Sequence, residues 1–241
     1  MESTIRINVW SGPRNISTAL MYSFAQRADT TVVDEPIYAH YLSTTDADQY
    51  HPHAADTLAS QSHDYQEVLD QVMLAEYETP IVFFKQMTHH LVNMPWDFMA
   101  QMVNVILTRD PVDMLPSYAR NVEQPSMLDV GYAEHHRLLI YLRSIGQEPC
   151  VLDAKSVLLD PEATLNALCQ RIGIPFDSSM LSWPAGSRPE DGAWAPAWYD
   201  NVHKSTGFMS YKKKDAPFPE HLKPLLAECQ PLYAELLELA I

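Results

Sequence analysis

Basic residues are scarce in this chain of 241 residues, which carries 16 lysines and arginines against 31 aspartates and glutamates. The formal net charge of −15 disfavours nucleic acid and other polyanions as general partners, because an acidic surface repels them. A small anion can still bind where positive charge is concentrated locally. The positions of the few lysines and arginines are therefore informative about function.

Cysteine is also rare, and long apolar runs are missing. The three cysteines, Cys150, Cys169 and Cys229, are far apart, odd in number and form no CxxC pair. This pattern disfavours disulfides and cysteine metal sites and indicates free thiols in a reducing cytosol. No apolar run reaches the roughly 20 residues of a transmembrane helix, and no secretory signal is recognised at the N-terminus. We expect a cytoplasmic protein with no membrane partner.

Two common catalytic signatures are absent as well. The chain has no GxxxxGK[ST] loop of the Walker type. Its ten histidines include no HExxH pair, and the neighbours His135 and His136 diverge on a helix. We therefore expect no metal.

Short apolar runs alternate with helical patterns along the chain. Strands are expected at residues 4–10, 30–33, 80–85, 103–107 and 149–152. Helices are expected at residues 17–28, 65–75, 90–99, 112–122, 133–145, 161–172 and 219–239. Apolar strands that alternate with helices predict a parallel sheet covered on both faces, a three-layer α/β fold.

Two stretches lack this periodicity. Residues 43–64 are polar, which predicts an exposed excursion that would suit a lid. Residues 176–218 are dense in Pro, Trp, Gly and Ser, which predicts irregular structure folded onto the rest. No internal repeat or convincing linker occurs, so we expect a single domain over residues 1–241.

The first expected strand is followed by a turn that opens a helix, Ser11-Gly12-Pro13-Arg14-Asn15-Ile16-Ser17-Thr18. A helix N-terminus presents unpaired backbone N–H groups and the positive end of the helix dipole. The hydroxyls of Ser17 and Thr18 add donors, and Arg14 adds a charged fork suited to phosphate or sulfate oxygens. The turn predicts an anion site, with a serine cap and a solvent-facing arginine as the alternative.

A second anion-binding group is expected further along the chain. The strand at residues 103–107 delivers Arg109 to the carboxyl edge of the sheet, where open α/β sheets bind ligands. Ser117 lies in the following helix, so that both side chains can face one anion. The alternative is a structural Arg-Asp-Pro turn with a local ion pair.

Together these segments resemble the sulfotransferase family. Residues 13–18 are similar to the family's loop for the 5′-phosphosulfate of 3′-phosphoadenosine 5′-phosphosulfate, with Asn15 and Ile16 in place of a small hydroxyl residue and a glycine. Residues 107–118 are similar to its 3′-phosphate motif, in which a serine follows an arginine by eight positions. The resemblance covers most of the chain. It implies a P-loop-like sulfotransferase fold and the phosphosulfate nucleotide as cofactor.

The resemblance also implies which residues hold the nucleotide. They are Gly12, Arg14, Asn15, Ser17 and Thr18 in the first loop, Arg109 and Ser117 in the second motif, and Ser156, Lys204, Ser205 and Gly207 in later segments. Arg14 is expected to face the group that moves. For the nearby basic run at residues 212–214 a solvated surface is favoured. Trp194 or Trp198 would pack on adenine, with core packing as the alternative.

Sulfuryl transfer needs a base for the acceptor's proton and positive charge near the transferring group. Glu35 follows the second expected strand and is the first candidate base, with a helix-capping carboxylate as the alternative; Asp34 is expected to point elsewhere. Lys85 matches the family's lysine and is expected to neutralise the transferring group. His90, or His89, is the rival base, because a histidine is well suited to proton transfer near pH 7.

Three functions are compatible with these motifs. The first is transfer of a sulfuryl group to a hydroxyl or amine of a small acceptor. The second is a kinase or nucleotide hydrolase, which the missing Gly-Lys-Ser/Thr disfavours. The third is a non-catalytic anion or nucleotide sensor, to which Ile16 gives weight because it crowds the loop and disfavours φ > 0. A partly apolar acceptor pocket is indicated by Tyr38, Tyr41, Trp96 and Trp194, and a homodimer is left open.

Overall fold

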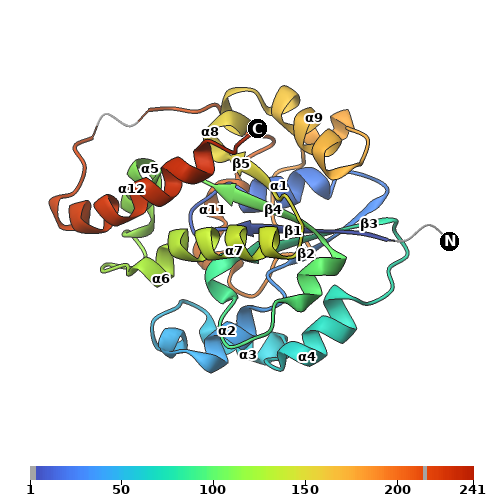
Figure 1. The fold of residues 1–241 in the computed structure, drawn as a ribbon, viewed down its shortest axis with the longest axis horizontal. Helices are drawn as coiled ribbons and strands as arrows, with labels where there is room; N and C mark the ends of the chain where they lie inside the picture. Colours follow the sequence, from blue (N-terminus) through green and yellow to red (C-terminus); the bar gives the residue numbers. More distant parts are fainter. Residues whose placement is uncertain (1–3, 214–215) are drawn as a thin grey trace.

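A five-stranded sheet lies at the centre of the computed structural model, which describes residues 4–213 and 216–241. Its strand order is β2-β3-β1-β4-β5, and every paired strand is parallel to its neighbour (Figure 1). The strands are β1 (Ile5–Ser11), β2 (Thr30–Asp34), β3 (Ile81–Met87), β4 (Val103–Thr108) and β5 (Cys150–Asp153). The predicted parallel sheet is confirmed, and each strand lies within two residues of the apolar run that predicted it.

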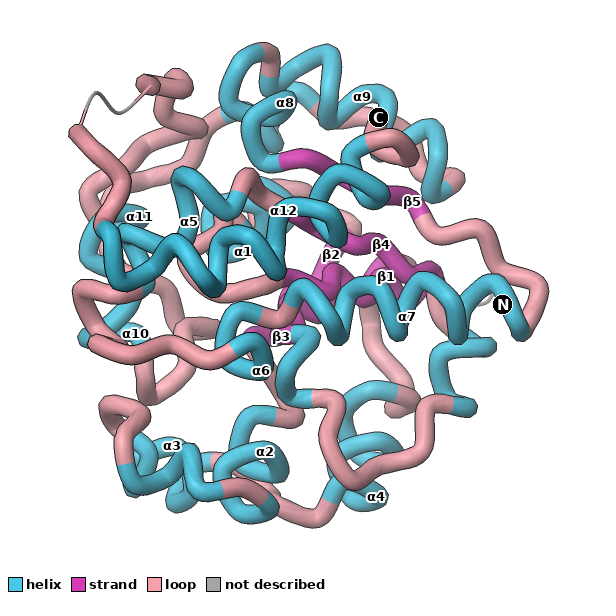
Figure 2. The backbone as a smooth tube through the Cα atoms, turned by 60° about the vertical axis from the view of Figure 1, so that its left-hand side comes forward, coloured by secondary structure: helices cyan, strands magenta, loops and turns pink. Residues whose placement is uncertain are grey.

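Helices cover both faces of the sheet. On one face, alternate strand residues such as Val9 pack with α1 (Ser17–Phe24) and α9 (Pro161–Ile172). On the other face, residues such as Trp10 pack with α7 (Tyr132–Ser144) and α12 (Lys223–Leu237), which lie side by side over the strands in Figure 2. Because both faces are buried, the strands read as continuous apolar runs in the sequence.

Shorter helices surround this framework. They are α2 (Tyr38–Thr44), α3 (Ala54–Ser60), α4 (Tyr65–Val68), α5 (Pro111–Tyr118), α6 (Met127–Val130), α8 (Ala154–Leu159), α10 (Ala195–Trp198) and α11 (Asp200–His203). A π-helical turn at Leu69–Met73 continues α4, and 3-10 turns lie at Asp46–Gln49, Thr88–His90, Asp97–Gln101, Ser178–Leu181 and Glu220–Leu222. No helix within the described ranges has the length and apolar character to cross a bilayer.

One prediction of local structure is incomplete and one is wrong. Residues 43–64 are mostly exposed, as predicted, but they contain the end of α2 and all of α3, and His51 and Thr57 within them are buried. Residues 90–99 do not form a helix but pass between two 3-10 turns. Pro95 lies between those turns, and a proline lacks the N–H that an α-helix needs there. The segment 176–218 is largely irregular, as predicted, apart from short elements such as α10 and α11.

Gly12 packs closely against the end of α6, and this contact gives a first prediction. A Cβ at this position would lie 2.9 Å from the backbone carbonyl oxygen of Val130. Since a backbone atom cannot swing aside, we expect Gly12→Ala to lower the free energy of unfolding by about 1–3 kcal/mol. Urea denaturation followed by circular dichroism measures this change. Asn166→Ala, at an exposed position of α9, is the control, and equal effects of the two substitutions would contradict the clash.

Candidate active site

A pocket lies where β1, β2 and β3 end, and it contains about 560 Å³ of empty space, part of it open to solvent. Parallel strands bring their carboxyl ends to one edge, so segments far apart in the sequence meet here. The lining residues are Pro13, Arg14, Asn15, Ser17, Thr18, Glu35, Tyr38, His51, Lys85, Met87, His89, His90, Tyr118, Trp194, Trp198 and Tyr199. The first loop, Glu35, Lys85 and the His89–His90 pair, all singled out from the sequence, therefore share one site.

Lys85 is buried at the end of β3 and has three polar partners. Its Nζ lies 2.9 Å from Oδ1 of Asp34 and 2.7 Å from Oη of Tyr199, and it also contacts Oε1 of Glu35. Burial lowers the pKa of Lys85, but the carboxylates of Asp34 and Glu35 outweigh burial and raise that pKa above its ordinary value. Lys85 is therefore a positive charge at neutral pH.

Asp34 does not point elsewhere, contrary to the sequence-based expectation. Glu35 has a φ of 41°, in the left-handed region, and at this turn of the backbone both neighbouring carboxylates reach Lys85. The second oxygen of Asp34 accepts hydrogen bonds from Oη of Tyr199 at 2.7 Å and from the backbone N–H of Gly192 at 3.1 Å. Asp34 thus ties the segment 192–199 to the end of β2.

Glu35 has one oxygen engaged and one available. Oε1 contacts Lys85, whereas Oε2 lies 3.9 Å from Nε2 of His90, beyond hydrogen-bond distance. Burial raises the pKa of Glu35, Lys85 lowers it, and Asp34 raises it again, which leaves that pKa at about 7. A carboxyl group that both binds and releases a proton near neutral pH suits general-base chemistry.

His90 and His89 are buried beside Glu35. Burial, and next the neighbouring His89, lower the pKa of His90 well below its ordinary value, and burial lowers the pKa of His89 to about 3. Both imidazoles are therefore neutral at physiological pH. A base that holds a proton so weakly is poorly suited to take one from an acceptor, which favours Glu35 for that role.

Arg14, Arg109 and Ser117 form one connected group. Nη1 of Arg109 donates to the carbonyl oxygen of Arg14 at 2.6 Å, and Nε of Arg14 donates to Oγ of Ser117 at 3.4 Å. Burial lowers the pKa of Arg14, and the like charges of Arg109 and Arg120 lower it further. In the part of the chain that the structure describes, the arginines with a carboxylate in ion-pair range are Arg27, Arg137, Arg143 and Arg188. The charges of Arg14 and Arg109 are thus available to an anion.

The first loop reaches its shape through Arg14 and not through Ile16. Arg14 has a φ of 50°, whereas Ile16 has an ordinary φ of −94°. The side chain of Asn15 fastens the loop by donating to the carbonyl of Leu107 at 3.0 Å. No side chain caps α1, which begins at Ser17, so backbone N–H groups of its first turn lack side-chain partners. The position of Ile16 therefore does not require a positive φ, which an isoleucine would disfavour.

The later basic segment does not line this pocket. Lys204 forms an exposed ion pair at the surface. Ser205 accepts a hydrogen bond from Nε1 of Trp183 at 3.1 Å, and Gly207 forms a bridge with Ser182. Ser205 and Gly207 thus hold residues 200–208 against the chain near Trp183, whereas Lys204 pairs with Asp200 of the same segment.

Four other predicted nucleotide ligands also lie outside the pocket lining, and two of them, Arg109 and Ser117, contact Arg14 directly. Gly12 packs on α6, as described above, and the backbone N–H of Ser156 donates to Oδ2 of Asp153 at 3.2 Å. Lys214, in the basic run at 212–214, lies outside the described residues. In the described part of the chain, no group of three or more histidines, cysteines and carboxylates is placed to hold a metal ion.

Tyr199 is the site residue that the sequence did not reveal. Its hydroxyl accepts from Lys85 and from Nε1 of Trp194, and donates to Asp34. It lies in a segment with no periodicity, and no motif marks it. Trp198, one residue earlier, supplies the carbonyl that accepts from Nη1 of Arg14 at 3.2 Å.

The aromatic residues expected to form the acceptor pocket divide into two groups. Tyr38 and Trp194 line the pocket, and Tyr41 lies fully buried next to His90. Trp96 instead packs edge-on against Tyr141, 5.3 Å between ring centroids. The wall is therefore partly apolar, as predicted, but Trp96 is not part of it.

The raised pKa of Glu35 predicts a pH-dependent contribution to stability. Its ordinary pKa is 4.5 and its pKa in the folded protein is about 7, so between these two pH values the folded state binds more protons than the unfolded state. The free energy of unfolding therefore falls as pH rises through this range. As the pH rises from about 5 to about 7, the free energy of unfolding should fall by about 2 kcal/mol less in Glu35→Gln than in the unsubstituted protein, because the glutamine does not titrate. Urea denaturation at several pH values tests this, with Glu162→Gln on α9 as the exposed control; parallel profiles for Glu35→Gln and the unsubstituted protein would contradict it.

Comparisons with known proteins agree with this geometry. The model of the sulfotransferase domain family matches residues 5–238. Branched-chain-amino-acid aminotransferase-like proteins 1 and 2 of Arabidopsis thaliana are 42% and 40% identical to this chain over 228 residues. The match covers 94% of this chain and 40% of each relative, so the chain spans about two fifths of their length.

Solved structures share the fold. The sulfotransferase domain from the curacin biosynthetic pathway has a TM-score of 0.56 at 14% identity and covers 95% of this chain and 99% of that one. Mouse sulfotransferase SULT7A1, solved in complex with PAP, has a TM-score of 0.54 at 12% identity and covers 98% of this chain and 84% of that one. The family model over nearly the whole chain and the shared parallel sheet lead to one conclusion: this chain belongs to the sulfotransferase domain family.

Proposed function

We propose that this protein transfers a sulfuryl group from 3′-phosphoadenosine 5′-phosphosulfate to a hydroxyl or amine of a small acceptor. The observation that carries the proposal is that unpaired positive charge lies next to a buried Glu–Lys pair. Arg14 lines this pocket with the buried pair of Glu35 and Lys85, and Arg109 joins Arg14 from outside the lining by donating to its carbonyl; among the described residues neither arginine has a carboxylate in ion-pair range. The two arginines suit an anionic nucleotide and the buried pair suits an acceptor that must lose a proton.

The residues present fit a nucleotide with anionic groups at both ends. Arg109 and Ser117 would hold the 3′-phosphate, and Arg14 with Ser17 and Thr18 would hold the 5′-phosphosulfate. Guanidinium groups, hydroxyls and a helix N-terminus are the donors that such oxygens prefer. When bound, the nucleotide supplies an activated sulfuryl group.

Glu35 acts on the acceptor through Oε2, the oxygen that Lys85 leaves free. Burial raises the pKa of Glu35 to about 7, so the ionised form can take the acceptor's proton near neutral pH. Lys85 keeps its charge because Asp34 and Tyr199 hold it, and it places positive charge beside the reacting groups. Aromatic walls from Tyr38 and Trp194 limit the access of water.

The other two functions receive less support from the site. A non-catalytic sensor needs an anion cradle but gives no role to a buried carboxyl group with a pKa near 7. Ile16 also has an ordinary φ, so the backbone of the loop needs no glycine at this position. A kinase or hydrolase would use a magnesium-bound triphosphate, and the first loop lacks the lysine that such proteins direct at its phosphates.

Ligand selectivity gives a direct test of the nucleotide. Saturating 3′-phosphoadenosine 5′-phosphate should raise the melting temperature by about 5 °C or more, while ATP and ADP should have smaller effects. Arg109→Ala should lose most of this shift, because it removes one guanidinium and releases the carbonyl of Arg14. Thermal unfolding with each nucleotide measures these shifts.

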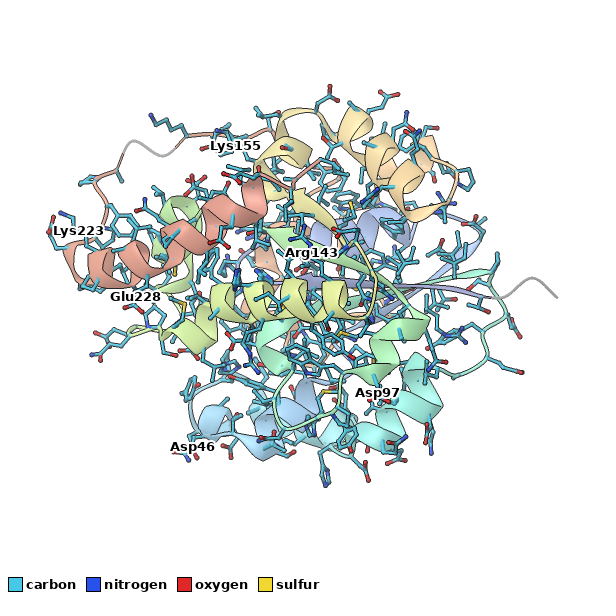
Figure 3. All side chains as sticks on the ribbon, in the orientation of Figure 1. Asp46, Asp97, Arg143, Lys155, Lys223 and Glu228 are labelled. Atoms are coloured by element: carbon cyan, nitrogen blue, oxygen red, sulfur yellow. The ribbon has the colours of Figure 1, made fainter. Side chains whose placement is uncertain are left out.

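The matched control is Arg143→Ala, since Arg143 is an exposed arginine on α7 whose partner is Glu148 (Figure 3). This variant should keep the full shift. Stabilisation by ATP with none by the bisphosphate would overturn the proposed donor.

Turnover tests the base. Glu35→Gln should lower kcat about 100-fold or more while keeping the thermal shift with the bisphosphate, because the amide cannot take a proton. In the unsubstituted protein, kcat/KM should rise with pH through about 7, since Glu35 is active only when ionised. Release of the bisphosphate measures both quantities. Glu162→Gln should behave as the unsubstituted protein, and full activity of Glu35→Gln would remove Glu35 from the mechanism.

A further inference from the structure

His90 is a buried side chain with two unused nitrogen atoms at the wall of the pocket. Its exposure is 0%, and neither Nδ1 nor Nε2 has a hydrogen-bond partner among the described residues. Leaving a buried polar atom unpaired costs about 1–3 kcal/mol, so such atoms are rare without a purpose. A ligand group in the pocket is one way to satisfy Nε2, the nitrogen nearer to Glu35.

The ring of His90 packs against two tyrosine rings. It stacks on Tyr38 with 4.6 Å between centroids and 12° between planes, and on Tyr41 with 4.8 Å and 26°. The two tyrosine rings lie only 6.4 Å from each other, so they pack against adjacent sides of the imidazole and restrict how its edge can turn. That edge places Nε2 at 3.9 Å from Oε2 of Glu35.

The carboxylate determines which nitrogen carries the proton. His90 is neutral, since burial and the nearby His89, His51, Lys85 and His40 lower its pKa well below the ordinary value. A neutral imidazole has one N–H and one lone pair. A lone pair on Nε2 would face the negative oxygen of Glu35 and be repelled, so the proton belongs on Nε2 and the lone pair on Nδ1.

An acceptor atom between the two groups would contact both. With 3.9 Å between Nε2 and Oε2, one atom can lie about 2.8 Å from each, which is ordinary hydrogen-bond length. That atom must donate its proton to Glu35, accept from Nε2–H of His90, and keep a lone pair for the new bond to sulfur. A hydroxyl oxygen has two lone pairs and meets all three demands, whereas an amine nitrogen has one lone pair and cannot.

We infer that His90 selects an alcohol oxygen over an amine nitrogen as the sulfuryl acceptor. This inference rests on the proposed function and narrows its acceptor to a hydroxyl compound. The hydroxyl proton passes to Glu35, and the free lone pair of the oxygen forms the O–S bond. The bond between sulfur and the nucleotide phosphate oxygen breaks, and its electron pair leaves with that oxygen. His90 gives up no proton and is a specificity-determining residue, not the base.

The tautomer of His90 can be measured without any turnover. Long-range ¹H–¹⁵N correlation NMR of the imidazole nitrogens, with His90→Gln used to assign the signals, should show His90 neutral with its proton on Nε2 at pH 7.5. A proton on Nδ1, or an imidazolium, overturns the inference even where no test acceptor reacts.

Matched acceptors then test the selection. Pairs such as 2-phenylethanol and 2-phenylethylamine, or cyclohexanol and cyclohexylamine, differ in the acceptor atom alone. After correction for the fraction of neutral amine, kcat/KM should favour the alcohol by about tenfold or more, the effect of roughly one hydrogen bond. His90→Phe should abolish this preference by slowing the alcohol, and His90→Gln, which keeps an N–H donor, should restore part of it.

Controls separate the possible failures. His63→Asn, at an exposed histidine, should keep the alcohol preference, and the bisphosphate thermal shift should show that His90→Phe is folded. Equal or faster turnover of amines by the unsubstituted protein overturns the choice of oxygen but leaves the sulfotransferase proposal intact. An unchanged alcohol-to-amine ratio in folded His90→Phe removes His90 from that choice. Absence of bisphosphate binding in every variant would instead count against the proposed function itself.

Discussion

The buried charge of Lys85 is the constraint on which the rest of the site depends. An ammonium group inside a protein is costly unless carboxylates and hydrogen-bond acceptors surround it, and removing one partner leaves an uncompensated charge. Asp34, Glu35 and Tyr199 supply that surrounding. Because these partners come from the end of β2 and from the segment 192–199, one cation fixes two remote parts of the chain against β3. Lys85, Asp34, Glu35 and Tyr199 therefore form one network of charges and hydrogen bonds that shapes the pocket.

Two neighbouring carboxylates divide the work within this network. Both oxygens of Asp34 are bound, to Lys85 on one side and to Tyr199 and Gly192 on the other, so it is a structural anchor. Glu35 shares the same lysine but leaves Oε2 free toward the pocket. Burial raises the pKa of Glu35 to about 7, and a group in that position can exchange protons. Different surroundings give two carboxylates different chemistry, a pattern common in enzyme active sites.

The sequence predicts the framework well and the connections of the site less well. Apolar runs mark all five strands because the sheet is covered on both faces, and residues that end a strand, such as Lys85, can be assigned to the ligand edge. The role of Asp34 is not predictable, since it depends on the left-handed φ of Glu35, a conformation that no residue type at this position signals. Tyr199 lies in a segment whose shape depends on tertiary contacts and not on local periodicity. Lys204, singled out because basic residues cluster in the sequence, lies outside the pocket lining and pairs with Asp200 at the surface.

The same left-handed backbone explains how a glycine-poor loop can form an anion site. Two of the four non-glycine residues with positive φ in the described chain, Arg14 and Glu35, line the pocket. Each such residue costs about 1 kcal/mol or more and persists only when its neighbours hold it. Here Arg109 holds the carbonyl of Arg14, and the N–H of Glu35 donates to the carbonyl of Lys85 at 2.8 Å. The strained positions are thus held by the residues with which they work, so that the same contacts that fold the anion site and the proton-accepting Glu35 also orient them.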